Sequence, residues 1–240
     1  MLRTLTDPLL SLVYPQHCRV CVGPVEHRAD GVSCGECWDE TLVFYGHEML
    51  CNKCGALLGP LNGPLPVLCR KCDEHHYEKA YAIGVYGKAL AAAVLELKQT
   101  PALPQRLRHL IGGIADSLPA ADVISPAPLS TERRLERGFN QAELIASELS
   151  RHLGTPVDAR SLERHLPTHV HRVGMDDKAR ELSVRNVFSV TRPKLIAGKS
   201  VLLVDDVFTS GATASNCAKV LKKSGAAQVN VFTIARAVWR

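Results

Sequence analysis

The chain has 240 residues, of which 46% are hydrophobic and 22% are charged, a composition typical of a globular protein with one full domain and a smaller one. No uncharged apolar run reaches the roughly 18 to 20 residues that span a bilayer, so we expect no membrane-spanning helix. The net charge of +5 divides into −4 for residues 1–78, with 6 Lys and Arg against 10 Asp and Glu, and +9 for residues 79–240, with 23 against 14. A basic C-terminal part suits a polyphosphate ligand or a nucleic-acid backbone, although scattered surface cations would give the same net charge.

The first 12 residues do not have the features of a secretory signal. Asp7 and Pro8 interrupt the apolar stretch, and no cleavage site of small residues follows it. We therefore expect a cytoplasmic protein, and nothing at this end of the sequence indicates the oxidising compartment that disulfides need.

Eight of the nine cysteines fall within the first 72 residues, as four C-x-x-C pairs. A gap of two residues lets both thiolates of a pair turn toward one ion, and two pairs complete the tetrahedral sulfur shell of a structural zinc. Taken in order, the pairs are separated by 12 and by 14 residues, which is close to the zinc-ribbon pattern. The sequence predicts two closed zinc sites with the ligands Cys18, Cys21, Cys34, Cys37, Cys51, Cys54, Cys69 and Cys72.

Other arrangements of these cysteines stay open at the level of sequence. An iron–sulfur cluster would use the same thiolates. The pairs could also interleave, with the first and third sharing one ion, and one ion could be lost altogether. His75 and His76 follow the last pair, but four thiolates are already at hand, so we interpret both as surface or core histidines. The expected role of the metal is to hold together a module, residues 1–78, that is too small to bury a core of its own.

Residues 79–240 alternate short apolar runs with amphipathic segments, which predicts an α/β fold with a parallel sheet flanked by helices. The expected strands are a run from Tyr81 to Tyr86, Asp122–Ser125, Val201–Val204 and Val229–Ala235. The expected helices are Lys88–Lys98, Gln141–Leu153 and Ala214–Leu221. Gly154 and Gly225 stand where the last two helices should stop.

The segment Val201–Thr213 is a strand that runs into two carboxylates, Asp205 and Asp206, and then into a small-residue loop and a helix. In an open α/β sheet, ligands bind beyond the carboxyl ends of the strands. The loop, Phe208–Thr213, offers backbone N–H groups at a helix N-terminus together with three hydroxyls, which form a phosphate cradle. Ionised carboxylates suit ribose hydroxyls instead, because hydroxyls donate hydrogen bonds to them. The combination predicts a ribose phosphate ligand.

Three other classes of structure share some of these features. A buried strand capped by an aspartate and a turn would explain the acidic pair, but not the Thr-Ser-Gly-x-Thr loop after it. A receiver domain also uses an acidic pair, yet it needs most of its fold after the pair, and only 34 residues follow Asp206. A Walker-type loop is excluded, because no Gly-Lys-Ser/Thr follows the glycine of the loop.

A basic run, Arg133, Arg134 and Arg137, stands between the second predicted strand and the helix at residue 141. Guanidinium groups bind a leaving pyrophosphate bidentately, which arginine does better than lysine. The same run, with Phe139 for base stacking, could contact single-stranded nucleic acid, and a solvated helix face would be equally basic. Gly138 indicates a turn, which favours a ligand-facing loop.

The motif Val204–Thr213 resembles the phosphoribosyl pyrophosphate motif of type I phosphoribosyltransferases, and nearly the whole chain is similar to the ComF family (ComFC-like and GntX-like members), bacterial proteins linked to competence and DNA uptake. The features that carry this resemblance are the four cysteine pairs, Leu95–Lys98, Pro126–Leu129, Arg137–Ala142, Arg180 with Arg185 and Asn186, and the acidic motif. The resemblance implies a type I phosphoribosyltransferase-like domain behind a double zinc ribbon, with Mg²⁺ bound alongside phosphoribosyl pyrophosphate.

Carried over position by position, the resemblance implies that Asp205 and Asp206 are the catalytic pair that holds the ribose hydroxyls, and that Thr209–Thr213 binds the 5-phosphate. It also implies that the turn near Ser125–Leu129 approaches the pyrophosphate. With the basic run included, the expected substrate-binding residues are Pro126, Ala127, Pro128, Arg133, Arg137, Val207, Phe208, Thr209, Ser210, Gly211, Ala212 and Thr213.

The chain departs from the family pattern at Ser130, where a histidine is usual, and at Ser210, where a threonine is usual. Ser210 keeps the hydroxyl of the usual threonine, so phosphate binding should survive. The family also commonly has a glutamine near His171, in the region after Arg164 that would form a hood over the site, and this chain lacks it there.

Two functions of different class follow from these observations. One is an enzyme, a phosphoribosyltransferase whose acceptor the sequence does not identify. The other is a non-catalytic binding protein that keeps the ribose-phosphate pocket while its basic surface and zinc module engage single-stranded DNA or DNA-uptake partners. The intact acidic pair and the complete hydroxyl loop favour the enzyme, because a relic pocket need not retain either.

Overall fold

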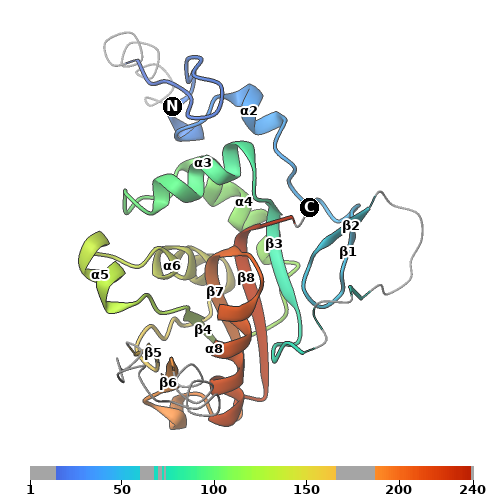
Figure 1. The fold of residues 1–240 in the computed structure, drawn as a ribbon, viewed down its shortest axis with the longest axis vertical. Coiled ribbons are helices and arrows are strands. Elements are labelled where there is room, and N and C mark those ends of the chain that lie inside the picture. The colour runs from blue at the N-terminus through green and yellow to red at the C-terminus, as the bar shows by residue number, and fades with distance from the viewer. Residues whose placement is uncertain (1–14, 60–67, 70–71, 73, 166–186, 239–240) are drawn as a thin grey trace, which may run out of the picture.

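The computed structural model describes residues 15–59, 68, 69, 72, 74–165 and 187–238 (Figure 1). Within them, four parallel strands form the central sheet in the order β3-β8-β7-β4. The bounds of these strands are β3 Ala80–Val85, β8 Gln228–Arg236, β7 Ser200–Phe208 and β4 Val123–Pro126. The predicted α/β class with a parallel sheet is confirmed.

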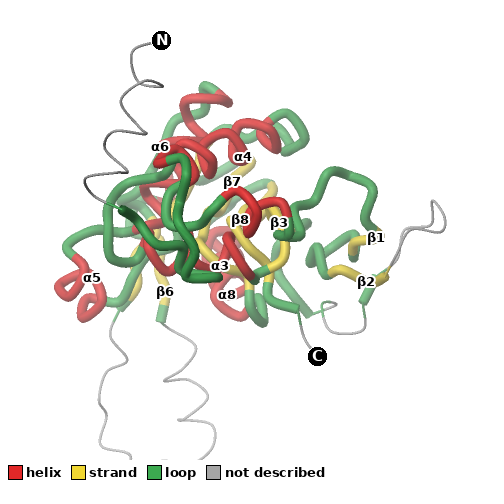
Figure 2. The backbone as a smooth tube through the Cα atoms, turned by 90° about the horizontal axis from the view of Figure 1, so that it is seen from above, coloured by secondary structure: helices red, strands yellow, loops and turns green. Residues whose placement is uncertain are grey.

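Helices cover both faces of the sheet (Figure 2). Their bounds are α3 Lys88–Leu97, α4 Gln105–Ala115, α6 Gln141–Leu153 and α8 Ala212–Lys223. Successive residues of β7 point to opposite faces. Leu202 and Val204 pack in one core with α3, α4 and α6, whereas Val201 and Leu203 pack in a second core with α8. All four side chains are buried, as expected of a central parallel strand.

Shorter elements surround the sheet. They are η1 Arg28–Asp30, α2 Gly35–Asp39, β1 Met49–Leu50, β2 Leu57–Gly59, α5 Thr131–Arg137, β5 Leu162–Arg164, β6 Phe188–Val190 and η2 Pro193–Leu195. β1 and β2 form an antiparallel pair in the cysteine-rich segment, and β5 and β6 form another. None of the helices in the described residues is long and apolar enough to cross a bilayer.

The seven strands and helices that were predicted are all present, and their bounds agree with the structure to within two residues except at the end of β7. Helix α6 spans the predicted residues, and Gly154 follows it with φ of 67°. Strand β7, however, continues to Phe208 instead of stopping at Val204, because its backbone stays paired with β8 beyond the apolar run. Helix α8 begins at Ala212, two residues before the predicted start. Helices α4 and α5 were not predicted.

The cysteine-rich segment extends the sheet at its β3 edge. Residues 42–44 run antiparallel to β3, and Phe44 donates its backbone N–H to Ile83 O at 2.7 Å. Gly84 permits this approach, because a Cβ there would lie 2.2 Å from Leu42 O. The segment therefore covers a strand edge that would otherwise present unpaired backbone groups to solvent.

Candidate functional site

Strand β7 carries the two adjacent carboxylates at the carboxyl edge of the sheet, between β4 and β8. Because successive strand residues face opposite sides, Asp206 continues the Val204 side, toward α3 and α6, and Asp205 continues the Leu203 side, toward α8. The electrostatics agree with this assignment, since burial and the Asp205 carboxylate raise the pKa of Cys217 in α8. The two carboxylates therefore lie on opposite faces of the sheet.

Asp206 is 9% exposed and is held from three directions. Lys98 Nζ, at the end of α3, lies 3.5 Å from its Oδ2, and Gln141 Nε2, at the start of α6, donates to the same oxygen at 3.1 Å. Val207 donates its backbone N–H to Oδ1 at 2.7 Å. The Oε1 of Gln141 is buried without a hydrogen-bond partner among the described residues. Asp206 thus ties the strand end to two helices and leaves a buried acceptor beside it.

Asp205 is partly buried, and its Oδ1 accepts the backbone N–H of Asp206 at 2.9 Å. Burial and the neighbouring Asp206 carboxylate raise the pKa of Asp205 to about 7, well above its ordinary value of 3.8, and the charge of Lys98 opposes part of this rise. A carboxylate in such surroundings is stabilised by any donor or cation that approaches it.

After the acidic pair the chain makes a short loop, Thr209–Gly211, whose first two residues are exposed. Gly211 has φ of 79°, a left-handed conformation that suits glycine, and directly precedes α8. Ser210 Oγ accepts a backbone N–H of the first helical turn at 3.3 Å, and Thr213 is exposed in that turn. The loop therefore presents hydroxyls and the N-terminus of a 12-residue helix to solvent, which is the arrangement of an anion site.

Two of the expected substrate-binding side chains are turned away from this rim. Phe208 is 3% exposed, and its ring packs beneath the loop against His75 and Arg236. Val207 packs against the core formed with α3, α4 and α6. Val207 lies on the same side as Val204 and Asp206, and Phe208 lies on the side of Leu203, so the strict alternation of the strand breaks between Asp206 and Val207.

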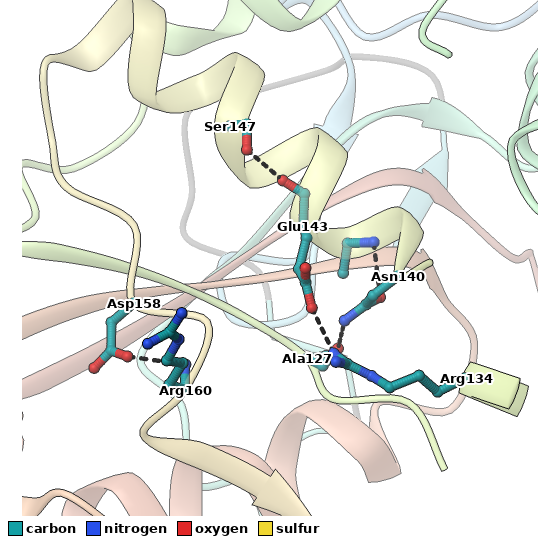
Figure 3. Close-up of polar contacts among 8 residues, drawn as sticks. Ala127, Arg134, Asn140, Glu143, Ser147, Asp158 and Arg160 are labelled. Atoms are coloured by element: carbon teal, nitrogen blue, oxygen red, sulfur yellow. Dashed lines mark hydrogen bonds and ion pairs between the residues drawn. The ribbon is translucent and has the colours of Figure 1, made fainter. Parts of the chain in front are cut away.

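The turn after β4, where pyrophosphate binding was expected, is fixed by hydrogen bonds (Figure 3). Pro126 and Ala127 are buried, and Ala127 donates its N–H to Val204 O at 2.7 Å. Asn140 Nδ2 donates to Ala127 O at 3.0 Å, while its Oδ1 accepts the N–H two residues on and caps α6. One side chain thus holds both the turn and the start of the helix.

The basic run forms the helix α5, so the predicted ligand-facing loop is wrong in its secondary structure. Gly138 ends this helix in the left-handed conformation, with φ of 75°, and does not open a loop. Arg133 is exposed, and Arg134 pairs with Glu143 of α6 at 2.6 Å (Figure 3). Arg137 is half-buried, and its Nη1 is buried without a hydrogen-bond partner in the described part of the chain.

The hood that the resemblance implies after Arg164 falls outside the described residues. This applies to the region of His171 and to the family-like Arg180, Arg185 and Asn186. β5 leads into this segment and β6 follows it, and the two strands pair antiparallel.

The eight N-terminal cysteines form two separate clusters of four, so their pairing is consecutive and the interleaved alternative is wrong. None of the eight forms a disulfide, and within each cluster the four sulfurs lie within 4.8 Å of one another. The sulfurs of Cys51 and Cys72 are 3.5 Å apart, and those of Cys54 and Cys69 are 3.4 Å apart. Tetrahedral zinc with Zn–S bonds of about 2.3 Å needs separations of about 3.8 Å. Both clusters therefore fit closed structural zinc sites.

Backbone N–H groups favour the ionised form of one thiol in each cluster. Burial opposes ionisation, but backbone donors outweigh it and lower the pKa of Cys18 and of Cys51 to about 6. Cys69 N–H, for example, lies 3.2 Å from Cys51 Sγ. Burial and the neighbouring thiols raise the pKa of Cys72 instead, because several thiolates in one site repel each other unless a cation binds them.

Three residues of the site were missed at the level of sequence: Lys98, Gln141 and Arg236. The first two lie in segments that carry the family resemblance, without a role of their own. Arg236 directly follows the apolar run of β8 at the sheet edge where β7 presents its acids. A charged residue placed directly after a buried parallel strand is the signal that would have identified it.

Comparison with protein families matches both parts of the chain. Residues 9–73 match the double zinc ribbon domain, and residues 137–237 match the phosphoribosyl transferase domain. The solved glutamine phosphoribosylpyrophosphate amidotransferase from B. subtilis aligns with 59% of this chain and 30% of its own, at 20% identity and a TM-score of 0.40, which is too distant to support a functional inference. The family matches confirm the predicted fold class and the zinc-binding character of the N-terminal cysteines.

Several curated relatives align with the chain over most of its length. DNA utilization protein YhgH of Salmonella typhi is 28% identical over 235 residues, which is 94% of this chain and 99% of that protein. Competence protein F of Haemophilus influenzae is 29% identical over 241 residues, 92% of this chain and 96% of that protein. Competence protein ComFC of Bacillus subtilis is 36% identical over 115 residues, 48% of this chain and 44% of that protein.

Proposed function

We propose that this chain, a member of the ComF family with a phosphoribosyltransferase-like domain and competence-associated relatives, binds phosphoribosyl pyrophosphate or another ribose 5-phosphate ligand with Mg²⁺ and transfers the phosphoribosyl group. The observation that carries the proposal is the acidic pair at the end of β7, directly followed by a hydroxyl-lined loop at the N-terminus of α8. The acceptor of the transfer is not identified.

The acidic pair fits the ribose part of such a ligand. Ribose hydroxyls are donors, and Asp205 is an acceptor whose ionised form lacks stabilisation in the free protein, as its raised pKa indicates. The unpartnered Oε1 of Gln141, next to Asp206, is a further acceptor for a hydroxyl group. Two ribose hydroxyls, one donating to the Asp205 carboxylate and one to Gln141 Oε1, would therefore supply the hydrogen bonds that both acceptors lack in the free site.

The loop fits the 5-phosphate. Thr209, Ser210 and Thr213 are exposed, and each offers a hydroxyl donor beside the backbone N–H groups that begin α8. A helix N-terminus attracts anions through its dipole and through its free N–H groups, and no carboxylate lies in the first turn of α8 to compete.

The donor set also fits a magnesium ion. Two adjacent carboxylates share the end of β7, and their mutual repulsion contributes to the raised pKa of Asp205. Mg²⁺ prefers oxygen ligands and is usually held by one or two carboxylates together with substrate phosphates. Asp205 and Asp206 would orient it, and it would supply charge neutralisation for the pyrophosphate oxygens.

Transfer of the phosphoribosyl group breaks the bond between C1′ and the pyrophosphate oxygen, so negative charge grows on the leaving group. The turn at Pro126–Pro128 adjoins the end of β7, since Ala127 bonds to Val204 O, and this turn would receive the pyrophosphate. Arg137 supplies an unpartnered guanidinium nitrogen in the helix that follows the turn. The contribution of the chain to catalysis is then position and electrostatics.

Calorimetric titration with phosphoribosyl pyrophosphate and Mg²⁺ tests the proposal. The parent should bind, and Asp205→Asn/Asp206→Asn should not. Ser210→Thr, which installs the residue usual in the family, is the matched control and should bind like the parent. Absence of binding by the parent would refute the proposed function. If the parent binds, measuring pyrophosphate release with a series of candidate bases would identify the acceptor.

A second candidate function, binding of single-stranded nucleic acid, is favoured by a different surface and by the DNA-related names of the relatives. A cavity of about 650 Å³ between the cysteine-rich segment and α4 is lined by Phe44, Tyr45, Tyr81, Lys79 and Arg106, among others. Tyr45 is 72% exposed, and Lys79 Nζ lies 4.9 Å from the ring centroid of Tyr81. Aromatic rings beside cations are what single-strand sites use to stack bases and to neutralise phosphates.

Fluorescence polarisation with a labelled oligothymidylate tests this second function. Tyr45→Ala/Lys79→Gln should weaken binding by about tenfold or more, since stacking on one aromatic ring contributes about 1–3 kcal/mol per base. Asp205→Asn/Asp206→Asn should leave oligothymidylate binding unchanged. If Arg133→Gln weakens binding while the cavity variant binds like the parent, α5 is the nucleic-acid surface and the cavity is not.

A further inference from the structure

The second cysteine cluster, Cys51, Cys54, Cys69 and Cys72, is connected by a buried arginine to the loop Thr209–Gly211, which we call the phosphate loop. Arg236 ends β8, directly opposite Phe208 of β7, and is 5% exposed. Its Nη2 donates to Cys54 Sγ at 3.3 Å, and its guanidinium carbon lies 4.3 Å from the ring centroid of Phe208. A buried cation between an anionic metal site and an aromatic face has favourable partners on both sides.

The phosphate loop rests on two rings that belong to this connection. A Cβ on Gly211 would lie 2.5 Å from Phe208 Cζ and 3.1 Å from His75 Nε2, so the loop backbone packs directly on both side chains. His75 follows Cys72 by three residues, and its ring stacks on Tyr77 with centroids 5.2 Å apart. The position of the loop is therefore set by residues that the second cluster holds in place.

The segment after Cys72 also holds the helix that carries the loop. His76 donates its backbone N–H to Ser215 Oγ, in the first turn of α8, at 3.2 Å. Glu78 pairs with Lys222 at 2.6 Å, near the other end of the same helix. Both ends of α8 are thus attached to the chain that leaves the second cluster.

The first cluster has a different environment, which makes it a control within the same molecule. Arg19, next to Cys18, pairs with Glu96 of α3 at 2.7 Å, and Trp38, next to Cys37, packs in the core with α3 and α4. Cys18, Cys34 and Cys37 form a separate buried group with Val25, whereas Cys21 is exposed. Among the described contacts, those of this cluster run to the α3 and α4 side and not to the phosphate loop.

We propose that Arg236 is a positioning residue that couples the second cysteine cluster to the phosphate loop, so that metal bound by this cluster holds Gly211 in its ligand-binding conformation. The four thiolates and one zinc carry a net negative charge, which Arg236 partly balances. When the ion is lost, Cys54 and Cys72 are no longer held together, and Arg236 and His75 lose the supports that press Phe208 against the loop. The identity of the phosphate ligand rests on the proposed function, but the coupling does not.

Hydrogen–deuterium exchange of the full-length, zinc-loaded protein tests the coupling without any ligand. In Arg236→Met, the amides of residues 209–215 should exchange about tenfold faster than in the parent, which corresponds to about 1.4 kcal/mol of lost local stability. The amides of residues 201–204, in the centre of β7, serve as an internal reference and should not change. Arg236→Lys keeps the charge but not the flat stacking on Phe208, so it should recover part of the protection.

Two cysteine variants separate the clusters. Cys54→Ser should accelerate exchange of residues 209–215, whereas Cys21→Ser, at the first cluster, should leave them unchanged while zinc release shows the loss of one ion. Unchanged protection in Arg236→Lys and Cys54→Ser, or equal acceleration in Cys21→Ser, would overturn the coupling. If Arg236→Met fails to fold, the Lys variant carries the comparison.

Ligand binding gives a second readout that distinguishes this coupling from the proposed function. Arg236→Lys should weaken ribose 5-phosphate and leave Mg²⁺-pyrophosphate unchanged, because the turn after β4 is held by Asn140 and not by the cysteine cluster. A parent that binds no ribose 5-phosphate refutes the proposed function, and the exchange comparison then decides the coupling alone. Equal weakening of both ligands would show a general loss of structure and would contradict a positioning role.

Discussion

Replacing Asp205 by Asn should stabilise the fold and abolish binding of the ribose ligand. Burial and the Asp206 carboxylate raise the pKa of Asp205 from 3.8 to about 7 in the folded protein. Between these two values the unfolded chain has lost the proton and the folded chain still holds it, so folding becomes less favourable as the pH rises from about 4 to about 7. Above pH 7 the parent bears the full free-energy cost of the buried charge, whereas the uncharged Asn side chain of the variant has no such cost.

The magnitude follows from the size of this difference. At 1.36 kcal/mol for each pKa unit, ionised Asp205 costs on the order of 2–4 kcal/mol at pH 8 and clearly less at pH 5. The free energy of unfolding of Asp205→Asn should therefore exceed that of the parent by about 2 kcal/mol more at pH 8 than at pH 5. Binding changes in the opposite direction, because Asn offers the ribose hydroxyls no charged acceptor.

Urea denaturation at pH 5 and pH 8, with tryptophan fluorescence as the signal, measures this difference. Glu132→Gln, at an exposed acid in the first turn of α5, is the matched control and should follow the parent at both pH values. A pH-independent difference between Asp205→Asn and the parent would refute the reasoning, and so would a variant that is less stable than the parent at pH 8.

Three further predictions concern single side chains. Asn140→Ala should lower the free energy of unfolding by about 1–3 kcal/mol in urea denaturation, because it removes the cap of α6 and leaves the carbonyl of Ala127 without its donor. Gly211→Ala should weaken ribose 5-phosphate in calorimetry, since its Cβ would lie 2.5 Å from Phe208, and Gly46→Ala, which has a similar φ of 89° but no atom within 4 Å, should not. Trp38→Ala should cost about 3–5 kcal/mol by thermal denaturation with zinc present, because Trp38 is 3% exposed in the core beside α3.

The parts of the fold that the sequence predicts well are those with a local signal. Helix α6 shows a helical apolar period, an asparagine at its start and a glycine after its end, and its bounds agree with the structure. The cysteine pairs carry their own spacing, which is enough to indicate zinc. The helix α5 had readable signals too, because Ser130 caps its start and Gly138 ends it, but the glycine alone was interpreted as a loop.

The contacts that shape the site depend on chain segments far apart in sequence, and no local pattern contains them. Lys98 and Gln141 meet Asp206 only because α3 and α6 pack on the same face of the sheet. Arg236 reaches Cys54 across 182 positions of the chain. The extra length of β7 has the same origin, since it is set by the partner strand β8.

Two carboxylates that are neighbours in sequence are not equivalent at the end of a parallel strand. Because side chains alternate along a strand, Asp206 lies on the face of α3 and α6, where Lys98 forms an ion pair with it and Gln141 donates a hydrogen bond to it. Asp205 goes to the face of α8, beside the phosphate loop, and keeps a pKa near 7 that marks a charge without sufficient stabilisation. Asp206 therefore has the environment of a residue that holds the strand end in place, and Asp205 has that of the residue that gains most when a ligand arrives.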